Sequence, residues 1–299
     1  MGVRIGTAER DSTFLSQGHA LKTVLERDPA LAPVEVSTSA HASVENANRL
    51  DAGDIDFGFM ASNWIGRARD GVQPFARQID LRMVAPMNAG PLFFITRADS
   101  ALATVTDLRG KRLVVGPQWS GMTQHARVIL GALGMSFADC TPLFLDFAAG
   151  ADAVASGAAD AQLQCPIPNK VMTALDARAA IRVLPYRPDD LETVLRTVPF
   201  YRRTIMLKGA LRGLAADEPQ VAVVNVLVTH ARIADDLVRQ VTAEIYAARD
   251  ELPRLNALFT GVGALFEPLR TDGARALEFG GVALHPGAVA AYRAERLLA

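Results

Sequence analysis

One stretch of the sequence has the spacing of a loop that binds phosphate groups. The run from Leu113 to Thr123 places glycines and a threonine at the spacing G-x-x-x-x-G-K-[ST] of a P-loop, after an apolar run and before a helical pattern. Met122 stands at the lysine position, so a triphosphate would lack its main charge partner. We expect this turn, through Ser120, Gly121 and Thr123, to bind a smaller anion such as a carboxylate. The alternative is an ordinary strand, turn and helix.

Three further junctions between an apolar run and a helical pattern carry small hydroxyl or amide side chains. They are Thr7 to Thr13, Ser37 to Ser43 with Asn46, and Ser62-Asn63. In open parallel sheets, ligands bind beyond the carboxyl ends of the strands, where helix N-termini present free N–H groups. Such residues are also ordinary helix N-caps, each contributing about 1 kcal/mol, and capping is the preferred interpretation for any single junction. Four similar junctions together predict convergence on one anion.

Few residues favour catalysis or a metal. The five histidines form neither H-E-x-x-H nor a close group with cysteine or aspartate at metal-ligand spacing, and no G-x-S-x-G motif occurs. His125 lies one helical turn after Ser120, and a cavity-lining or surface histidine is preferred there over a Ser/His pair. Arg10 could pair with a ligand carboxylate, or it could be an exposed loop charge. We expect no catalytic residue, no metal and no cofactor.

The elements that must position these residues alternate in type along the chain. Short β-rich runs alternate with amphipathic segments, which favours βαβ units, a mostly parallel sheet and Rossmann-like α/β architecture. The expected strands are Val3–Gly6, Val34–Ser37, Phe57–Met60, Leu113–Gly116, Leu143–Leu145 and Ile181–Leu184. The expected helices are Gln17–Arg27, Val44–Ala52, Met122–Leu133, Ala148–Ser156, Asn169–Ala177 and Leu191–Thr197. The sequence itself indicates no internal repeat.

A chain of 299 residues favours two lobes. One crossing between the lobes is predicted by two extended runs, Leu81–Ala85 and Leu92–Thr96, which are joined by a turn-rich bridge. The return to the first lobe is predicted at a further extended run, Thr204–Leu207. We expect a discontinuous first lobe of residues 1–90 and 206–299, completed by a mainly helical final third. Residues 91–205 would form an inserted second lobe, with a hinge and a ligand cleft between the two.

Composition excludes several classes of partner. The formal charge of -1 comes from acids and bases spread along the chain, so nucleic acid and membrane surfaces are poor candidates. No apolar stretch reaches the roughly 20 residues that span a bilayer. The first residues contain no apolar signal core, so the protein is either cytosolic or begins after a removed leader. Cys140 and Cys165 predict no disulfide framework, and their pairing stays open.

Several short motifs follow one another along nearly the whole chain. They include Ile5-Gly6-Thr7 with Thr13, Gly18-His19-Ala20-Leu21, Ser43-Val44-Glu45-Asn46, Leu50 to Phe57, Asp107 to Gly116, Ser120-Gly121, Pro199-Phe200-Tyr201, and Leu284 to Ala288 with Tyr292. In order and spacing, this set resembles the TAXI family of TRAP-transporter solute receptors. The resemblance implies a periplasmic protein with a bilobal periplasmic-binding-protein fold. Its ligand would be a glutamate-like amino acid or other small organic acid, delivered to an ion-driven permease.

Transfer of the family's ligand positions implies a cleft formed by Thr13, Phe14, Ser43, Ser62, Asn63, Ser120 and Gly121. The chain departs from the family at Asp11-Ser12, where a glycine pair is usual, at Ala61, where glutamine is usual, and at Met122, which displaces a threonine. These departures affect the ligand more than the fold. We expect a monomeric, non-enzymatic binding protein, and the alternatives are an enzyme or a cytosolic small-molecule sensor on the same scaffold.

Overall fold

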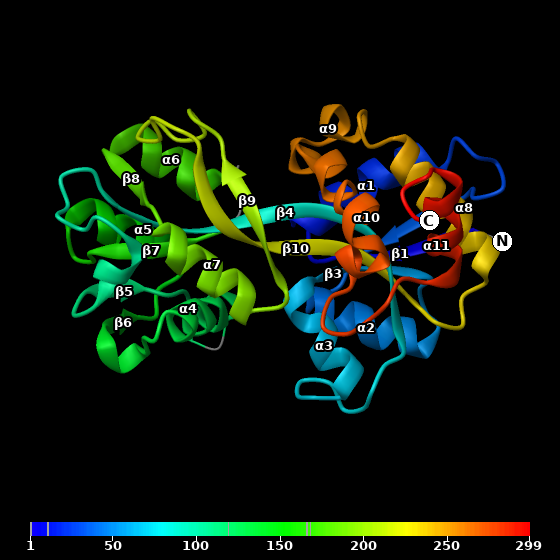
Figure 1. The fold of residues 1–299 in the computed structure, drawn as a ribbon, viewed down its shortest axis with the longest axis horizontal. Coiled ribbons are helices and arrows are strands. Elements are labelled where there is room, and N and C mark those ends of the chain that lie inside the picture. The colour runs from blue at the N-terminus through cyan, green and yellow to red at the C-terminus, as the bar shows by residue number, and fades with distance from the viewer. Residues whose placement is uncertain (1, 11, 119, 166, 168) are drawn as a thin grey trace. The chain divides into compact units, whose positions relative to one another are not determined.

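The computed structural model describes residues 2–10, 12–118, 120–165, 167 and 169–299, and it divides the chain into two compact units (Figure 1). Unit 1 comprises Met1–Ala89 and Val224–Ala299, and unit 2 comprises Gly90–Val223. The chain enters unit 2 within strand β4 (Leu81–Arg97) and returns within strand β10 (Glu218–His230). The bridge expected in the first crossing is therefore part of one continuous strand. Proline is compatible with extended backbone where no N–H donor is needed, so the prolines at 86 and 91 do not interrupt β4.

Unit 1 is built on a sheet with the strand order β2-β1-β3-β10. Strands β1 (Val3–Gly6), β2 (Val34–Ser37) and β3 (Phe57–Ala61) are parallel, and β10 is antiparallel to β3. Helices α1 (Thr13–Leu25), α2 (Ala42–Ala52) and α3 (Ser62–Asp70) follow the three parallel strands. Gly53 ends α2 with a φ of 84°, a left-handed conformation that glycine adopts without strain.

The C-terminal part of the chain adds helices to unit 1. Helices α8 (Asp235–Ala247) and α11 (Pro286–Ala294) pack side by side, and α9 (Leu252–Leu255) and α10 (Pro268–Asp272) lie between them in the sequence (Figure 1). Tyr292 in α11 is fully buried and its hydroxyl donates to Val84 O at 2.8 Å, which ties this helix to β4. Among the described residues, no helix is both long and apolar enough to cross a membrane.

Unit 2 contains a second sheet, in which the parallel strands β5 (Arg112–Val114), β6 (Thr141–Leu143) and β7 (Ala161–Gln164) have the order β7-β5-β6. Strands β7 and β8 (Ile181–Leu184) are antiparallel to β4, and β9 (Tyr201–Met206) is antiparallel to β10. The helices are α4 (Gly121–Ala132), α5 (Phe147–Ser156), α6 (Lys170–Arg178) and α7 (Pro188–Thr197). The run expected at Thr204–Leu207 largely belongs to β9, and the chain returns to unit 1 within β10.

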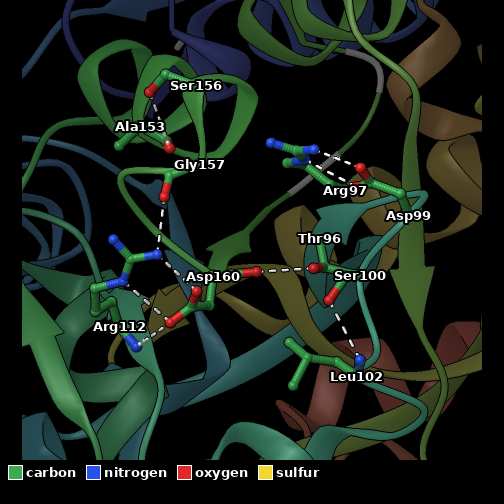
Figure 2. A network of polar contacts seen from close by, with 10 residues as sticks. All are labelled: Thr96, Arg97, Asp99, Ser100, Leu102, Arg112, Ala153, Ser156, Gly157 and Asp160. Carbon is green, nitrogen blue, oxygen red and sulfur yellow. Dashed lines mark hydrogen bonds and ion pairs between the residues drawn. The ribbon is translucent and has the colours of Figure 1, made fainter.

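A polar network joins the amino ends of β5 and β7 in unit 2 (Figure 2). The backbone N–H of Arg112 donates to Asp160 Oδ2 at 2.8 Å, and its guanidinium donates to Asp160 and to Gly157 O. Thr96 Oγ1 on β4 donates to Asp160 O at 2.7 Å. The Arg112–Asp160 pair therefore links three strands, and Arg112 also bonds the glycine that ends α5.

Unit 1 contains the same network. The backbone N–H of Arg4 donates to Asp56 Oδ2 at 2.9 Å, and its guanidinium donates to Asp56 and to Gly53 O. Thr229 Oγ1 on β10 donates to Asp56 O at 2.7 Å. The strand orders β2-β1-β3 and β6-β5-β7 also agree, so the two units share one βαβαβ arrangement. This structural repeat corrects the expectation of no internal repeat. The sequence alone could not reveal the repeat, because the two units share few residues.

The repeated elements pack with their large and small residues exchanged. In unit 1 the large residue is Asn46 on helix α2 and the small residue is Gly6 on strand β1. A Cβ added at Gly6 would lie 2.6 Å from Asn46 Oδ1. In unit 2 the equivalent helix residue, counted back from the glycine that ends the helix, is Gly150. A Cβ added there would lie 2.6 Å from Val114 Cγ1 and 2.4 Å from Gln162 Nε2. Each unit thus achieves close helix–sheet packing by a different residue choice.

Candidate ligand-binding site

Three helices of unit 1 begin where its parallel strands end, because α1, α2 and α3 follow β1, β2 and β3 in turn. Their N-termini therefore lie along the carboxyl edge of one sheet. Free N–H groups and the positive end of the helix dipole favour a negatively charged group at such an edge. Ser12 caps α1 through Oγ, which accepts a hydrogen bond from Leu15 N at 3.1 Å.

The site residues expected near the start of α1 differ in exposure. Arg10 is exposed in the turn before the helix, and Thr13, the first residue of α1, is half-buried. Phe14 is 7% exposed, and its ring centroid lies 5.4 Å from that of Phe59. Phe14 therefore contributes to the core of unit 1, whereas Arg10 and Thr13 are accessible.

Two expected serines stabilise the backbone at the carboxyl end of β3. Ser43 Oγ accepts a hydrogen bond from Ala61 N at 3.0 Å, and Ser62 Oγ accepts one from Val224 N at 3.2 Å. Both side chains are buried. Asn63 follows in α3, and its Oδ1 is buried with no hydrogen-bond partner among the described residues. An unpaired buried polar atom costs about 1–3 kcal/mol, so this amide is a candidate for a ligand or water contact.

A cluster of three buried amides lies beside this edge, and the sequence interpretation did not include it. Gln17 Nε2 and Asn225 Nδ2 both donate to Asn88 Oδ1, at 3.2 and 3.1 Å. Gln17 Oε1 is buried and has no partner in the described part of the chain. We call Gln17, Asn88 and Asn225 the amide cluster. A polar residue inside an apolar run, as Asn225 is within Val221–Val228, was the signal that could have revealed it.

In unit 2, the turn before α4 is held by its own hydroxyl groups. Ser120 caps α4 through Oγ, which accepts a hydrogen bond from Thr123 N at 3.2 Å. Thr123 is 3% exposed, and its hydroxyl donates to Pro117 O at 2.7 Å. Thr123 therefore fixes the shape of the turn, while half-buried Ser120 occupies the helix N-terminus, as Ser12 does in unit 1.

The glycines of this turn have different roles. Gly116 has a φ of 88°, and a Cβ there would lie 2.7 Å from Met122 Cβ, so the turn requires glycine at this position. Gly121 is exposed, and a Cβ added there would meet no atom of the described residues within 4 Å. Open space therefore lies at the N-terminus of α4. Trp119 belongs to this turn but lies outside the described residues.

A histidine–tyrosine pair occupies the position in unit 2 that corresponds to Gln17 in unit 1, counted from the serine that caps each helix. His125 Nδ1 lies 2.7 Å from the Tyr201 hydroxyl, and His125 is 7% exposed. Burial lowers the pKa of His125 to about 4, so the imidazole is neutral at pH 7. Burial, and then the neighbouring Tyr186 and Cys165, raise the pKa of Tyr201. Each unit therefore has an uncharged polar side chain, Gln17 or His125, five residues after the serine that caps the helix.

Neither cysteine has the properties of an activated nucleophile. Cys140 and Cys165 are both free thiols, and Cys165 Sγ lies 3.0 Å from Met122 Sδ. Desolvation raises the pKa of Cys165 to about 12, whereas a reactive thiol needs a lowered pKa. The described residues contain no group of three or more His, Cys, Asp or Glu side chains that could hold a metal ion.

Two α/β units linked by two crossing strands define the bilobal periplasmic-binding-protein fold. The chain is similar over 99% of its length to the periplasmic aliphatic sulphonate binding protein SsuA from Escherichia coli, with 17% identity, 88% coverage of SsuA and a TM-score of 0.52. It is also similar over 99% of its length to a TctC solute binding protein from Polaromonas, with 12% identity, 95% coverage of that chain and a TM-score of 0.57. These similarities confirm the fold class predicted from the sequence.

Residues 5–295 match the NMT1-like family, and the chain therefore belongs to the NMT1-like family. The match spans both units and both crossings between them.

Proposed function

We propose that this protein is an extracytoplasmic solute-binding protein that captures a small organic anion and delivers it to the membrane permease of a TRAP-type transporter. Its fold and its family support a binding role. The TAXI subdivision, the TRAP permease and a carboxylate or glutamate-like ligand rest on the sequence motifs described above. The E. coli neighbour binds aliphatic sulphonates, which makes sulfonates a second class of anion to test.

The observation that carries this proposal is the open N-terminus of α4. Ser120 caps it, Gly121 is exposed with free space beside it, and Met122 stands where a P-loop would have a cation. Backbone N–H groups and the helix dipole favour a small anion there by about 0.3 to 1 kcal/mol, and up to about 2 kcal/mol when the anion is partly buried. A polyphosphate would need more positive charge than this turn supplies.

Binding without conversion is the form of the proposal that the side chains support best. His125 is neutral and hydrogen-bonded to Tyr201, and the thiol of Cys165 has a raised pKa. General acid–base catalysis works best with a group that titrates near the operating pH, and neither group does so. An enzyme on this scaffold would consume a ligand that stabilises it, which a turnover assay would detect.

A thermal-shift screen of carboxylates, amino acids and alkanesulfonates tests the function. A ligand at 100 times its dissociation constant stabilises the native state by about 2.7 kcal/mol. For a chain of this length, that raises the melting temperature by several degrees. Mass spectrometry of the same samples should recover the stabilising ligand unchanged. Stabilisation by none of these anions, or consumption of the one that binds, would refute the proposal.

A further inference from the structure

The amide cluster in unit 1 offers hydrogen-bonding groups that the fold itself does not use. Gln17 comes from α1, Asn88 from β4 and Asn225 from β10, and the three are at most 8% exposed. The cluster lies near the carboxyl end of β3, because Asn225 is opposite Ala61 in the register of β10 and β3. We infer that the amide cluster is a specificity site that recognises a carboxamide group of the ligand. This inference rests on the proposed binding function and narrows its ligand class.

The internal hydrogen bonds determine which atoms remain available. Asn88 Oδ1 already accepts two hydrogen bonds, from Gln17 Nε2 and Asn225 Nδ2. Asn88 Nδ2 has no hydrogen-bond partner among the described residues, so it remains a donor. Gln17 Oε1 is buried without a partner in the described part of the chain. The one side-chain hydrogen bond of Asn225 among the described residues uses Nδ2, so Oδ1 also remains an acceptor.

One donor beside two acceptors selects for the chemistry of the ligand group. A carboxylate offers only acceptors and would leave Asn225 Oδ1 and Gln17 Oε1 unpaired. An ammonium offers only donors and would leave Asn88 Nδ2 unpaired. A carboxamide offers an acceptor oxygen and two N–H donors, so it can satisfy both kinds of atom. A site built to bond a particular polar group discriminates strongly against analogues that leave its own atoms unpaired.

The charge around the cluster agrees with an uncharged ligand group. All three side chains are neutral, and Arg10, the cation expected to meet a carboxylate, is exposed in the turn before α1. A second, charged end of the ligand would be bound by a helix N-terminus, as the proposed function requires.

Paired probes test the inference directly. Glutamine and glutamate, asparagine and aspartate, and succinamate and succinate differ within each pair only at the carboxamide. Titration calorimetry with the whole chain should give an affinity at least tenfold higher for the amide in one or more of these pairs. Equal or tighter binding of the carboxylate in every pair that binds would overturn the inference while leaving the binding function intact.

The substitution Asn88→Asp changes the free donor and keeps the internal contacts. The retained oxygen can still accept from Gln17 and Asn225, while the donor becomes a second acceptor. We expect the tenfold amide preference to fall below twofold. Asn48→Asp is the matched control, because Asn48 is exposed on α2 and the change in net charge is the same. Circular dichroism of the ligand-free variants monitors folding.

The outcomes separate the inference from the function on which it rests. A full amide preference in Asn88→Asp would overturn the assignment of the cluster. Should that variant fail to fold, the wild-type comparison of paired probes still decides the matter. If neither the paired probes nor the anions of the thermal-shift screen bind the wild-type chain, the proposed function fails together with the inference.

Discussion

His125 is the residue whose ionisation should affect stability most clearly near neutral pH. The unfolded chain takes up a proton at this side chain near pH 6.5, whereas the folded chain does so only near pH 4. Between these two pH values the unfolded state binds one more proton than the folded state. The free energy of unfolding is therefore highest above pH 6.5 and decreases as the pH falls toward 4. Between pH 7 and pH 4.5, we expect the free energy of unfolding to lose about 2 kcal/mol from this group.

The variant His125→Gln isolates this effect, since it places in α4 the residue type found at the equivalent position of α1. Urea unfolding at pH 7 and pH 4.5 should show a smaller loss of stability in the variant than in the wild type. His230 and His285, whose pKa values are also lowered by burial, remain in both proteins and cancel in the comparison. Equal losses in both proteins would show that His125 is protonated in the native state.

Gly121 is the residue that tests the anion site in unit 2. Because a Cβ there meets no atom of the described part of the chain within 4 Å, Gly121→Val should leave the circular dichroism spectrum unchanged. Valine would cover the N–H groups at the start of α4, so we expect ligand binding to be abolished in titration calorimetry. Ser120→Ala should weaken binding by about 1 to 3 kcal/mol if its hydroxyl is a buried ligand donor. Wild-type affinity in Gly121→Val would place the anion elsewhere.

Residues in local patterns were predictable, and residues that meet only through the fold were not. Ser120 and Gly121 were identified because a strand, a turn and a helix start follow one another in the sequence. Gln17 and Asn88 are 71 positions apart, and Asn88 and Asn225 are 137 apart, so no local pattern could join them. The functional roles expected of all the site residues remain predictions, including those of Ser120 and Gly121 as well as those of Thr13, Phe14, Ser43, Ser62, Asn63, Thr123 and Arg10.

At the scale of elements, amphipathic periodicity predicted the helices well. Each of the six expected helices is present within a few residues of its expected ends. Strand β7 was missed because Ala161–Gln164 is only four residues long and two of them are glutamines, although all four are buried. Gln162 is accommodated there because α5 offers Gly150 opposite it, and this pairing is not local in the sequence. Helix α3 was read only as a polar junction, since Gly66 and its charged residues obscure an apolar stripe.

The exchanged packing of α5 predicts opposite effects for two glycine substitutions. A Cβ at Gly150 would lie 2.4 Å from Gln162 Nε2 and 2.6 Å from Val114 Cγ1, so Gly150→Ala should lower stability by about 1–3 kcal/mol. A Cβ added at Gly131 in α4 would meet no described atom within 4 Å, so Gly131→Ala should raise stability by about 0.5–1 kcal/mol. Urea unfolding measures both. Stabilisation by Gly150→Ala would contradict the packing described for α5.

At the scale of the whole molecule, the two crossings within β4 and β10 lead us to expect hinge closure on binding. A ligand that contacts both units would favour a closed form by its differential affinity for that form. Small-angle scattering should then give a smaller radius of gyration at saturating ligand than without ligand. Gly121→Val, measured at the same ligand concentration, is the control and should keep the ligand-free radius. An unchanged radius in the wild type would indicate a rigid site within one unit.

Both ends of the chain belong to unit 1, because unit 2 is inserted between the two crossings (Figure 1). Fluorescent proteins fused to the two termini would therefore both report on the same unit. A biosensor made from this scaffold needs one dye in each unit, for example at exposed Asn48 in unit 1 and exposed Lys111 in unit 2. Terminal tags, by the same connectivity, can be attached for immobilisation without linking one unit to the other.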